Sequence, residues 1–123
     1  MFVVTMLLRR RPDLSAEEFH AYWREHHGPL AVSTAEVTGI RRYMQLHAIP
    51  SAVGEGLAAA RGAATSEWDG VALLWFDSEE AAVAAAMTPE GRAATSALLA
   101  DEREFLDLPR CEFLISEDQT LIG

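Results

Sequence analysis

Two histidines stand side by side in the segment Phe19–Leu30, immediately before Gly28 and Pro29. Imidazole is the side chain whose ordinary pKa lies near neutrality, so His26 and His27 could accept and release protons at ordinary pH. A helix that ends at Gly28 would also place both rings near its negative C-terminus. The two histidines are therefore candidates for acid–base chemistry. The alternative is that one of them only caps the last carbonyls of the helix.

A second group of polar side chains alternates along the segment Ile40–Ala48. Tyr43, Gln45 and His47 would lie on one face of a β-strand, because side chains two residues apart point the same way. A tyrosine hydroxyl can stabilise a developing enolate oxygen, a histidine can move the proton, and the glutamine adds a neutral donor. The alternative is a polar sheet face that meets solvent or a dimer partner.

Asp101 lies on an otherwise apolar helical face with Leu98 and Phe105. A carboxylate in such surroundings is either paired or has a shifted pKa. It could orient a histidine of the site. An ordinary salt bridge to Arg92 or Arg103 is the favoured alternative.

Aromatic side chains would supply the walls of a binding pocket. Trp68 follows a loop and precedes a strand, which suits the rim of a pocket, whereas core packing is the default expectation for Trp75. We expect catalytic roles for His27, Tyr43, His47 and Asp101. We expect the substrate to contact Trp23, His26, Gln45, Trp68, Trp75 and Phe105.

Composition and motifs exclude several classes of protein. The chain has 123 residues and a formal net charge of −9, which argues against nucleic acids and anionic membrane surfaces as partners. Adjacent helical residues diverge by about 100°, so His26 and His27 rarely share one ion, and HExxH and CxxC motifs are absent. GxGxxG, P-loop and GxSxG motifs are also absent. We therefore expect no metal and no cofactor.

Further expectations concern the chain as a whole. Cys111 is the only cysteine, so the chain forms no internal disulfide. The longest apolar runs, such as Val71–Phe76, are too short to span a bilayer, which takes about 20 residues. We expect a cytoplasmic protein in which residues 1–123 form a single domain.

The elements that must position these residues can be predicted from periodicity and caps. Ser15 and Glu18 form a capping box that starts a helix, and Gly28 and Pro29 should end it, with Gly28 as a left-handed cap. A second capping box is expected from Asp77 and Glu80. The predicted strands are Phe2–Arg9, Ile40–Ala48, Val71–Asp77 and Cys111–Glu117, and the other predicted helices are a short one near 56–61, Ala81–Met87 and Thr88–Leu106.

This order, β-α-β-β-α-β, is that of a ferredoxin-like α+β fold with a four-stranded antiparallel sheet. The helices can cover only one face of such a sheet. A second copy is the simplest cover for the other face, so the pattern predicts a homodimer.

These segments resemble the EthD domain family of the dimeric α+β barrel superfamily. The resemblance rests on Leu14–Leu30 with its His-Gly-Pro, on Tyr43–His47, on Trp68–Phe76, on Asp101–Asp107 and on Glu117. It implies a homodimer with a pocket between sheet and helices, small cofactor-free chemistry, and His27 as a candidate acid or base.

Three functions are consistent with this resemblance. The first is a cofactor-free lyase or isomerase, of the dehydratase, cyclase or decarboxylase type, acting on a small aromatic or polyketide-like substrate. The second is a cofactor-free monooxygenase of the same superfamily. The third is a non-catalytic accessory protein that holds a small molecule or haem.

Overall fold

The computed structural model describes residues 1–123 and contains four strands and seven helical segments. In chain order they are β1 (Phe2–Leu8), α1 (Ala16–Tyr22), η1 (Trp23–His27), α2 (Gly28–Thr38), β2 (Arg42–His47), α3 (Ala52–Ala60), β3 (Gly70–Phe76), α4 (Glu79–Met87), α5 (Pro89–Phe105), η2 (Leu108–Arg110) and β4 (Glu112–Glu117). None of the helices is both long enough and apolar enough to cross a bilayer.

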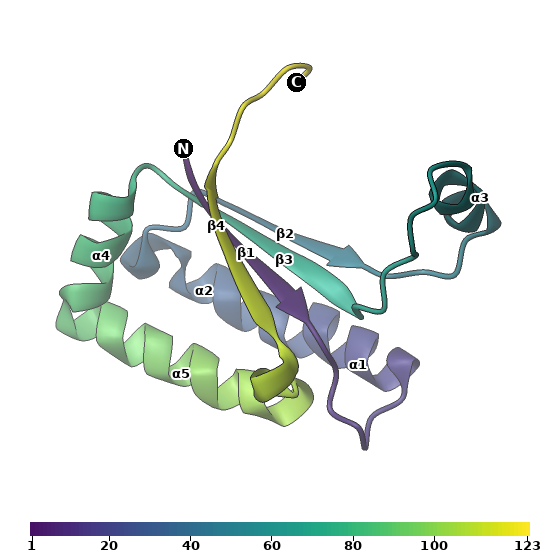
Figure 1. The fold of residues 1–123 in the computed structure, drawn as a ribbon. Helices are drawn as coiled ribbons and strands as arrows, with labels where there is room; N and C mark the ends of the chain where they lie inside the picture. The colour runs from purple at the N-terminus through teal and green to yellow at the C-terminus, as the bar shows by residue number, and fades with distance from the viewer.

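The strands form one antiparallel sheet in the order β2-β3-β1-β4. Helices α1, α2, α4 and α5 lie against one face of this sheet, and α3 extends beyond one end of it (Figure 1). The predicted α+β, ferredoxin-like fold is therefore confirmed.

The core lies between the sheet and the helices. β1 alternates so that Met6 and Leu8 face inward, where they meet Phe19, Trp23 and Phe105. Phe19 packs against the rings of both Trp23 and Phe105, with centroids 5.6 and 5.7 Å apart. This contact joins α1 and η1 to α5, so it fixes the position of the histidines that follow on the same helical rod.

The first helix does not end at Gly28 and Pro29, and this prediction was wrong. Gly28 has helical dihedral angles (φ −56°, ψ −52°), and the rod continues to Thr38. Pro29 has no N–H to donate and its ring crowds the preceding turn. The chain accommodates it by widening residues 23–27 into a π-helical turn, in which the Gly28 N–H bonds to the Trp23 carbonyl.

The cap of α4 also differs from the prediction. Ser78 is the N-cap, and its hydroxyl accepts a hydrogen bond from the Ala81 N–H. The Asp77 carboxylate instead binds the Arg41 guanidinium at 2.8 and 3.0 Å. The first capping box, from Ser15 and Glu18, is confirmed.

The sheet face opposite the helices is uncovered in the single chain. It presents Leu73 and Trp75 of β3, half-buried, together with Leu46 and Leu114, which are 45% and 57% exposed. Exposed apolar groups of this kind on a continuous sheet are typical of an interaction surface.

Helices α4 and α5 meet at a tight corner, where a Gly91→Ala substitution should destabilise the fold. A methyl group at Gly91 would overlap the carbonyl oxygen of Ala85, which cannot move aside because it belongs to the backbone. We expect a loss of about 1 to 3 kcal/mol in the free energy of unfolding, measured in urea. The matched control is Gly56→Ala in α3, where the new methyl would meet nothing within 4 Å. This variant should be neutral or slightly stabilising, and equal losses in both would contradict the prediction.

Candidate active site

A small cavity of about 130 Å³ lies between the sheet and the helices. We call it the inner cavity. Twelve hydrophobic residues line it, Tyr43 among them, and the other two lining residues are His27 and Glu102. Three groups that can exchange protons thus face an otherwise apolar space.

His27 reaches this cavity from η1 and is held from behind by Asp101 of α5. Its Nδ1 lies 2.8 Å from one carboxylate oxygen of Asp101, and its side chain is 10% exposed. A carboxylate can only accept, so the hydrogen of neutral His27 sits on Nδ1 and the Nε2 lone pair is free. That arrangement is the one a general base requires.

The electrostatics of the pair favour a neutral histidine beside a charged aspartate. Burial lowers the pKa of His27, although the hydrogen bond and charge of Asp101 act in the opposite direction. Burial alone would raise the pKa of Asp101, but hydrogen bonds from Tyr22 and His27 outweigh it and lower that pKa. Tyr22 donates to Asp101 at 2.5 Å, which orients the carboxylate.

The sequence alone favoured a salt bridge from Asp101 to Arg92 or Arg103, and that preference was wrong. Neither arginine pairs with Asp101, which instead binds Tyr22 and the two adjacent histidines. The His26 side chain is 63% exposed, stacks on Tyr22 and touches the outer edge of the carboxylate at 3.2 Å. His26 therefore lies outside the inner cavity.

The polar face of β2 points toward the helices. Tyr43 reaches the inner cavity, and Gln45 donates to the Tyr43 hydroxyl at 2.8 Å and to the Trp23 carbonyl at 2.9 Å. His47 Nε2 lies 2.7 Å from the Gln45 side-chain oxygen. The structure therefore places this face of β2 against the helices rather than in solvent.

His47 is separated from the inner cavity by Trp23. The two rings lie 4.3 Å apart, and the indole also closes against Gly70. His47 instead lines an outer groove of about 520 Å³ between α3 and the ends of β2 and β3, together with Trp68. Trp68 lies at this outer groove, where the Arg9 guanidinium stacks over its ring at 4.3 Å.

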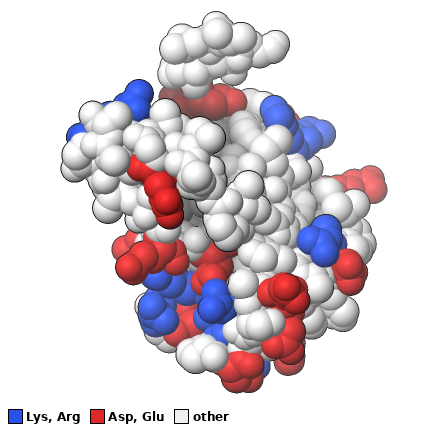
Figure 2. Space-filling view, turned by 90° about the vertical axis from the view of Figure 1, so that its right-hand side faces the viewer, with Lys and Arg blue, Asp and Glu red and all other residues white.

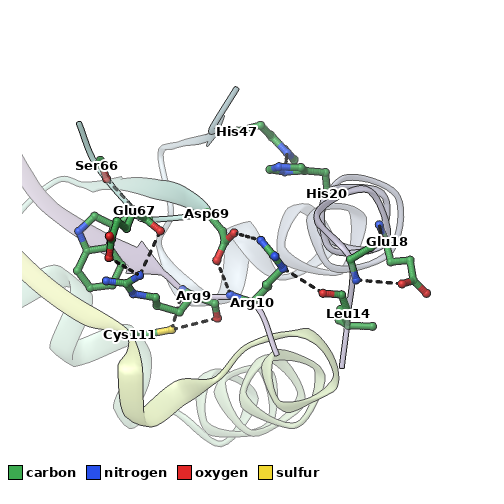
Figure 3. A network of polar contacts seen from close by, with 12 residues as sticks. Arg9, Arg10, Leu14, Glu18, His20, His47, Ser66, Glu67, Asp69 and Cys111 are labelled. Atoms are coloured by element: carbon green, nitrogen blue, oxygen red, sulfur yellow. Dashed lines mark hydrogen bonds and ion pairs between the residues drawn. The ribbon is translucent and has the colours of Figure 1, made fainter. Parts of the chain in front are cut away.

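Ion pairs from Arg9 and Arg10, just after β1, hold the segment that precedes β3 and carries Trp68 (Figure 3). The Arg10 guanidinium binds the Asp69 carboxylate at 2.6 Å, and the Arg10 backbone N–H donates to the same carboxylate.

The expected contact of Trp75 with a bound molecule has no basis in this geometry. Trp75 lies on the uncovered sheet face, beneath the Arg42 guanidinium, and donates to Asp118.

Glu102 is a candidate site residue that we did not expect from the sequence. It follows Asp101 on α5 and lines the inner cavity, where burial raises its pKa to about 7 and the Asp101 charge adds to the rise. Its spacing from Leu98 and Leu106, four residues to each side, was the available signal. A carboxyl group in the middle of an apolar helical stripe can serve as a proton donor near neutral pH.

A Glu102→Gln variant should be more stable than the wild type at pH 8 but not at pH 4. The raised pKa means that the folded protein binds the proton more tightly than the unfolded chain, so ionisation of Glu102 costs stability as pH rises through about 4.5 to 7. We expect a gain of about 1 to 3 kcal/mol at pH 8, after allowance for solvent screening. Urea unfolding at both pH values measures it, with Glu104→Gln on the exposed side of α5 as the control. An equal effect at pH 4 and pH 8 would contradict a raised pKa.

A match to a known protein family covers most of the chain. The profile of the EthD domain matches residues 11–109, a stretch that contains His27, Tyr43 and Asp101. The chain belongs to the EthD domain family. No curated protein sequence is significantly similar to this EthD-domain protein.

Solved structures share its fold at low sequence identity. An ethyl tert-butyl ether d (ethd) family protein from Bacillus halodurans is 20% identical, with a TM-score of 0.61 over 97% of this chain and all of that one. A dimeric protein of unknown function with a ferredoxin-like fold, from Bacteroides fragilis, is 15% identical, with a TM-score of 0.59 over 95% of each chain. A putative antibiotic biosynthesis monooxygenase from Deinococcus radiodurans is 15% identical, with a TM-score of 0.53 over all of this chain and 97% of that one. Together they show that the chain shares the ferredoxin-like fold of these proteins.

Proposed function

We propose that this EthD-domain protein is a cofactor-free lyase or isomerase that moves a proton on a small ring-shaped substrate in the inner cavity. The observation that carries the proposal is the buried His27–Asp101 pair, whose free Nε2 belongs to a residue lining an apolar cavity. A neutral base, a carboxyl group at Glu102 that is protonated below about pH 7 and a phenol at Tyr43 make up a set for proton transfer in a mostly apolar space.

The roles follow from the charge states. His27 takes a proton from the substrate and Asp101 stabilises the imidazolium that results. Tyr43 donates to the substrate oxygen on which negative charge develops. Glu102, protonated below about pH 7, can return a proton elsewhere on the ring.

The size of the cavity limits the substrate. A cavity of about 150 Å³ is known to admit benzene, so a space of about 130 Å³ suits one six-membered ring. Phe113 lines the cavity and is 64% exposed, so we expect larger substituents to extend past that side chain.

A second copy of the chain completes the proposal, because it would cover the apolar sheet face around Leu73, Trp75 and Leu114. Dimeric relatives such as the Bacteroides fragilis protein support this arrangement. Sedimentation equilibrium should give twice the mass of one chain, and a monomer at micromolar concentration would contradict the dimer.

The test of the activity is a panel of phenols and small lactones followed through the imidazole NMR signals. A compound that shifts the His27 resonances is then tested for turnover in wild type and in His27→Gln. Loss of turnover in the variant with binding retained supports proton transfer. A panel in which no compound shifts His27 would contradict the proposal.

A cofactor-free monooxygenase is the second candidate function, because the Deinococcus radiodurans protein with the same fold is a putative antibiotic biosynthesis monooxygenase. An oxygen electrode distinguishes the two, since a lyase or isomerase turns over without consuming oxygen.

A further inference from the structure

We propose that Gln45 is a positioning residue that makes Tyr43 an obligatory hydrogen-bond donor toward the inner cavity. The cavity would then select ring molecules with an acceptor oxygen, such as a carbonyl, at the Tyr43 end. This inference rests on the proposed function, because it concerns the ligand of the same cavity.

The orientation of the Gln45 amide is fixed by the backbone of η1. Its nitrogen lies 2.9 Å from the carbonyl oxygen of Trp23, which can only accept, so the NH₂ group must face that oxygen. Gly28 leaves room for this contact, since a Cβ there would come within 3.0 Å of the Gln45 nitrogen. The glycine of the His-Gly-Pro segment thus lets a strand side chain reach the helix backbone.

The second hydrogen of the amide determines the direction of the Tyr43 hydroxyl. Gln45 donates it to the Tyr43 oxygen at 2.8 Å. The Tyr43 hydrogen cannot point back along the same line, so it remains available to a ligand in the cavity that Tyr43 lines. Burial raises the pKa of Tyr43, although hydrogen bonds from Gln45 and Trp23 oppose the rise, so the phenol keeps its hydrogen at neutral pH.

His47, itself hydrogen-bonded to His20, holds the oxygen end of the Gln45 amide. The Gln45 oxygen accepts from His47 Nε2 at 2.7 Å, so that nitrogen carries the hydrogen. His47 Nδ1 lies 2.7 Å from His20 Nδ1, and the two rings face each other from β2 and α1 (Figure 3). Burial lowers the pKa of both rings, and the neutral pair places the shared hydrogen on His20 Nδ1.

The two ends of the cavity therefore have opposite hydrogen-bonding character. Tyr43 donates, and His27 presents the unprotonated Nε2 because its Nδ1 donates to Asp101. A ligand that satisfies both has a carbonyl or similar oxygen at one end and an O–H or acidic C–H group at the other. A cyclic ketone or hydroxy-substituted enone has that chemistry.

The first experiment compares cyclohexanone with methylenecyclohexane, which has the same shape and lacks the acceptor oxygen. We measure both affinities by NMR titration in wild type, Gln45→Glu, Tyr43→Phe and the double variant. In Gln45→Glu the new oxygens attract the Tyr43 hydrogen, so the ratio of the two affinities should fall about 2- to 10-fold, as for the loss of one hydrogen bond. Methylenecyclohexane should bind as before. Tyr43→Phe should lower the ratio similarly, and adding Gln45→Glu to it should change nothing more.

The control is Gln119→Glu, the same chemical change in the exposed C-terminal segment. A lower ratio in Tyr43→Phe with an unchanged ratio in Gln45→Glu would overturn the inference and leave the proposed function intact. If neither compound binds while a phenol or lactone of the panel shifts His27, the inference alone is overturned. If no compound of the panel shifts His27 either, the proposed function is overturned as well.

A second measurement needs no ligand. Nitrogen-15 NMR of the imidazoles should show His47 with its hydrogen on Nε2 and His20 with its hydrogen on Nδ1, which is the less common form in water. If the hydrogen of His47 were on Nδ1 instead, the hydrogen bonds from His20 through His47 to Gln45 would run in the opposite direction, and the inference would be overturned.

Discussion

An Asp101→Asn variant should lose about 100- to 10,000-fold in kcat/KM toward the ring compound that the NMR panel identifies as a substrate. The amide keeps the shape of the side chain but has no charge to stabilise the imidazolium that His27 becomes. Whenever its NH₂ group faces Nδ1, it also holds the His27 proton on the wrong nitrogen. The corresponding change in a serine protease triad costs about 10,000-fold for the same reason.

The size of this effect follows from the geometry of Asp101. The carboxylate is buried and binds Tyr22 and His27 at once, at 2.5 and 2.8 Å, so no solvent group can replace it. Its charge and hydrogen bond are also what hold the pKa of His27 up against burial. An NMR titration of Asp101→Asn should therefore show a further fall in the His27 pKa.

The control for this variant is Asp77→Asn, which removes an exposed carboxylate that pairs with Arg41. It should keep full activity. Activity of Asp101→Asn within about threefold of wild type, with an unchanged His27 pKa, would show that the pair plays no part in the chemistry.

A Trp23→Ala variant should lose about 3 to 5 kcal/mol of unfolding free energy, the usual cost of removing a large buried aromatic side chain. Trp23 is 1% exposed, packs on Phe19 and His47, and fills the space above Gly70. The neighbours cannot close over the gap, because they are held by the sheet on one side and by α5 on the other. Urea unfolding, monitored by far-ultraviolet circular dichroism, measures the loss.

The matched control is Trp68→Ala. Trp68 is half-buried in the segment before β3, and its ring contacts Arg9. Its loss should cost clearly less than that of Trp23. Equal costs would mean that Trp23 is not the centre of the core. Because Trp23 also separates the inner cavity from the outer groove, the same variant should admit ligands larger than one ring.

Surface charge gives a further view of the chain. Figure 2, which looks at the molecule from the side of α3, shows acidic and basic side chains interspersed instead of gathered into one patch of a single sign. This face therefore offers no basic patch to a polyanion, in keeping with the net charge of −9 for the whole chain. The ligand that the interior favours is instead small and uncharged.

Periodicity and caps predicted the elements well, because these depend on residues close in sequence. The capping box at Ser15, the proline start of α5 at Thr88 and Pro89, and the alternation along β1 each needed only a few neighbours. The exceptions have local competitors. A Gly-Pro pair usually ends a helix, but here the helix widens into a π-helical turn and continues past Pro29. Asp77 binds Arg41 and does not cap α4.

For the candidate site too, some features depend on the sequence alone and others on the tertiary structure. The sequence by itself determined which groups could do chemistry: His27, Tyr43 and Asp101, on elements of predictable type and order. Only the tertiary structure decided which of them meet. The partner of Asp101 is 74 residues away in sequence, the wall between His47 and the cavity is a tryptophan of another element, and Glu102 became a candidate because burial changed its pKa. The physical reason is that hydrogen bonds, desolvation and charge act across space, whereas helix and strand patterns act along the chain.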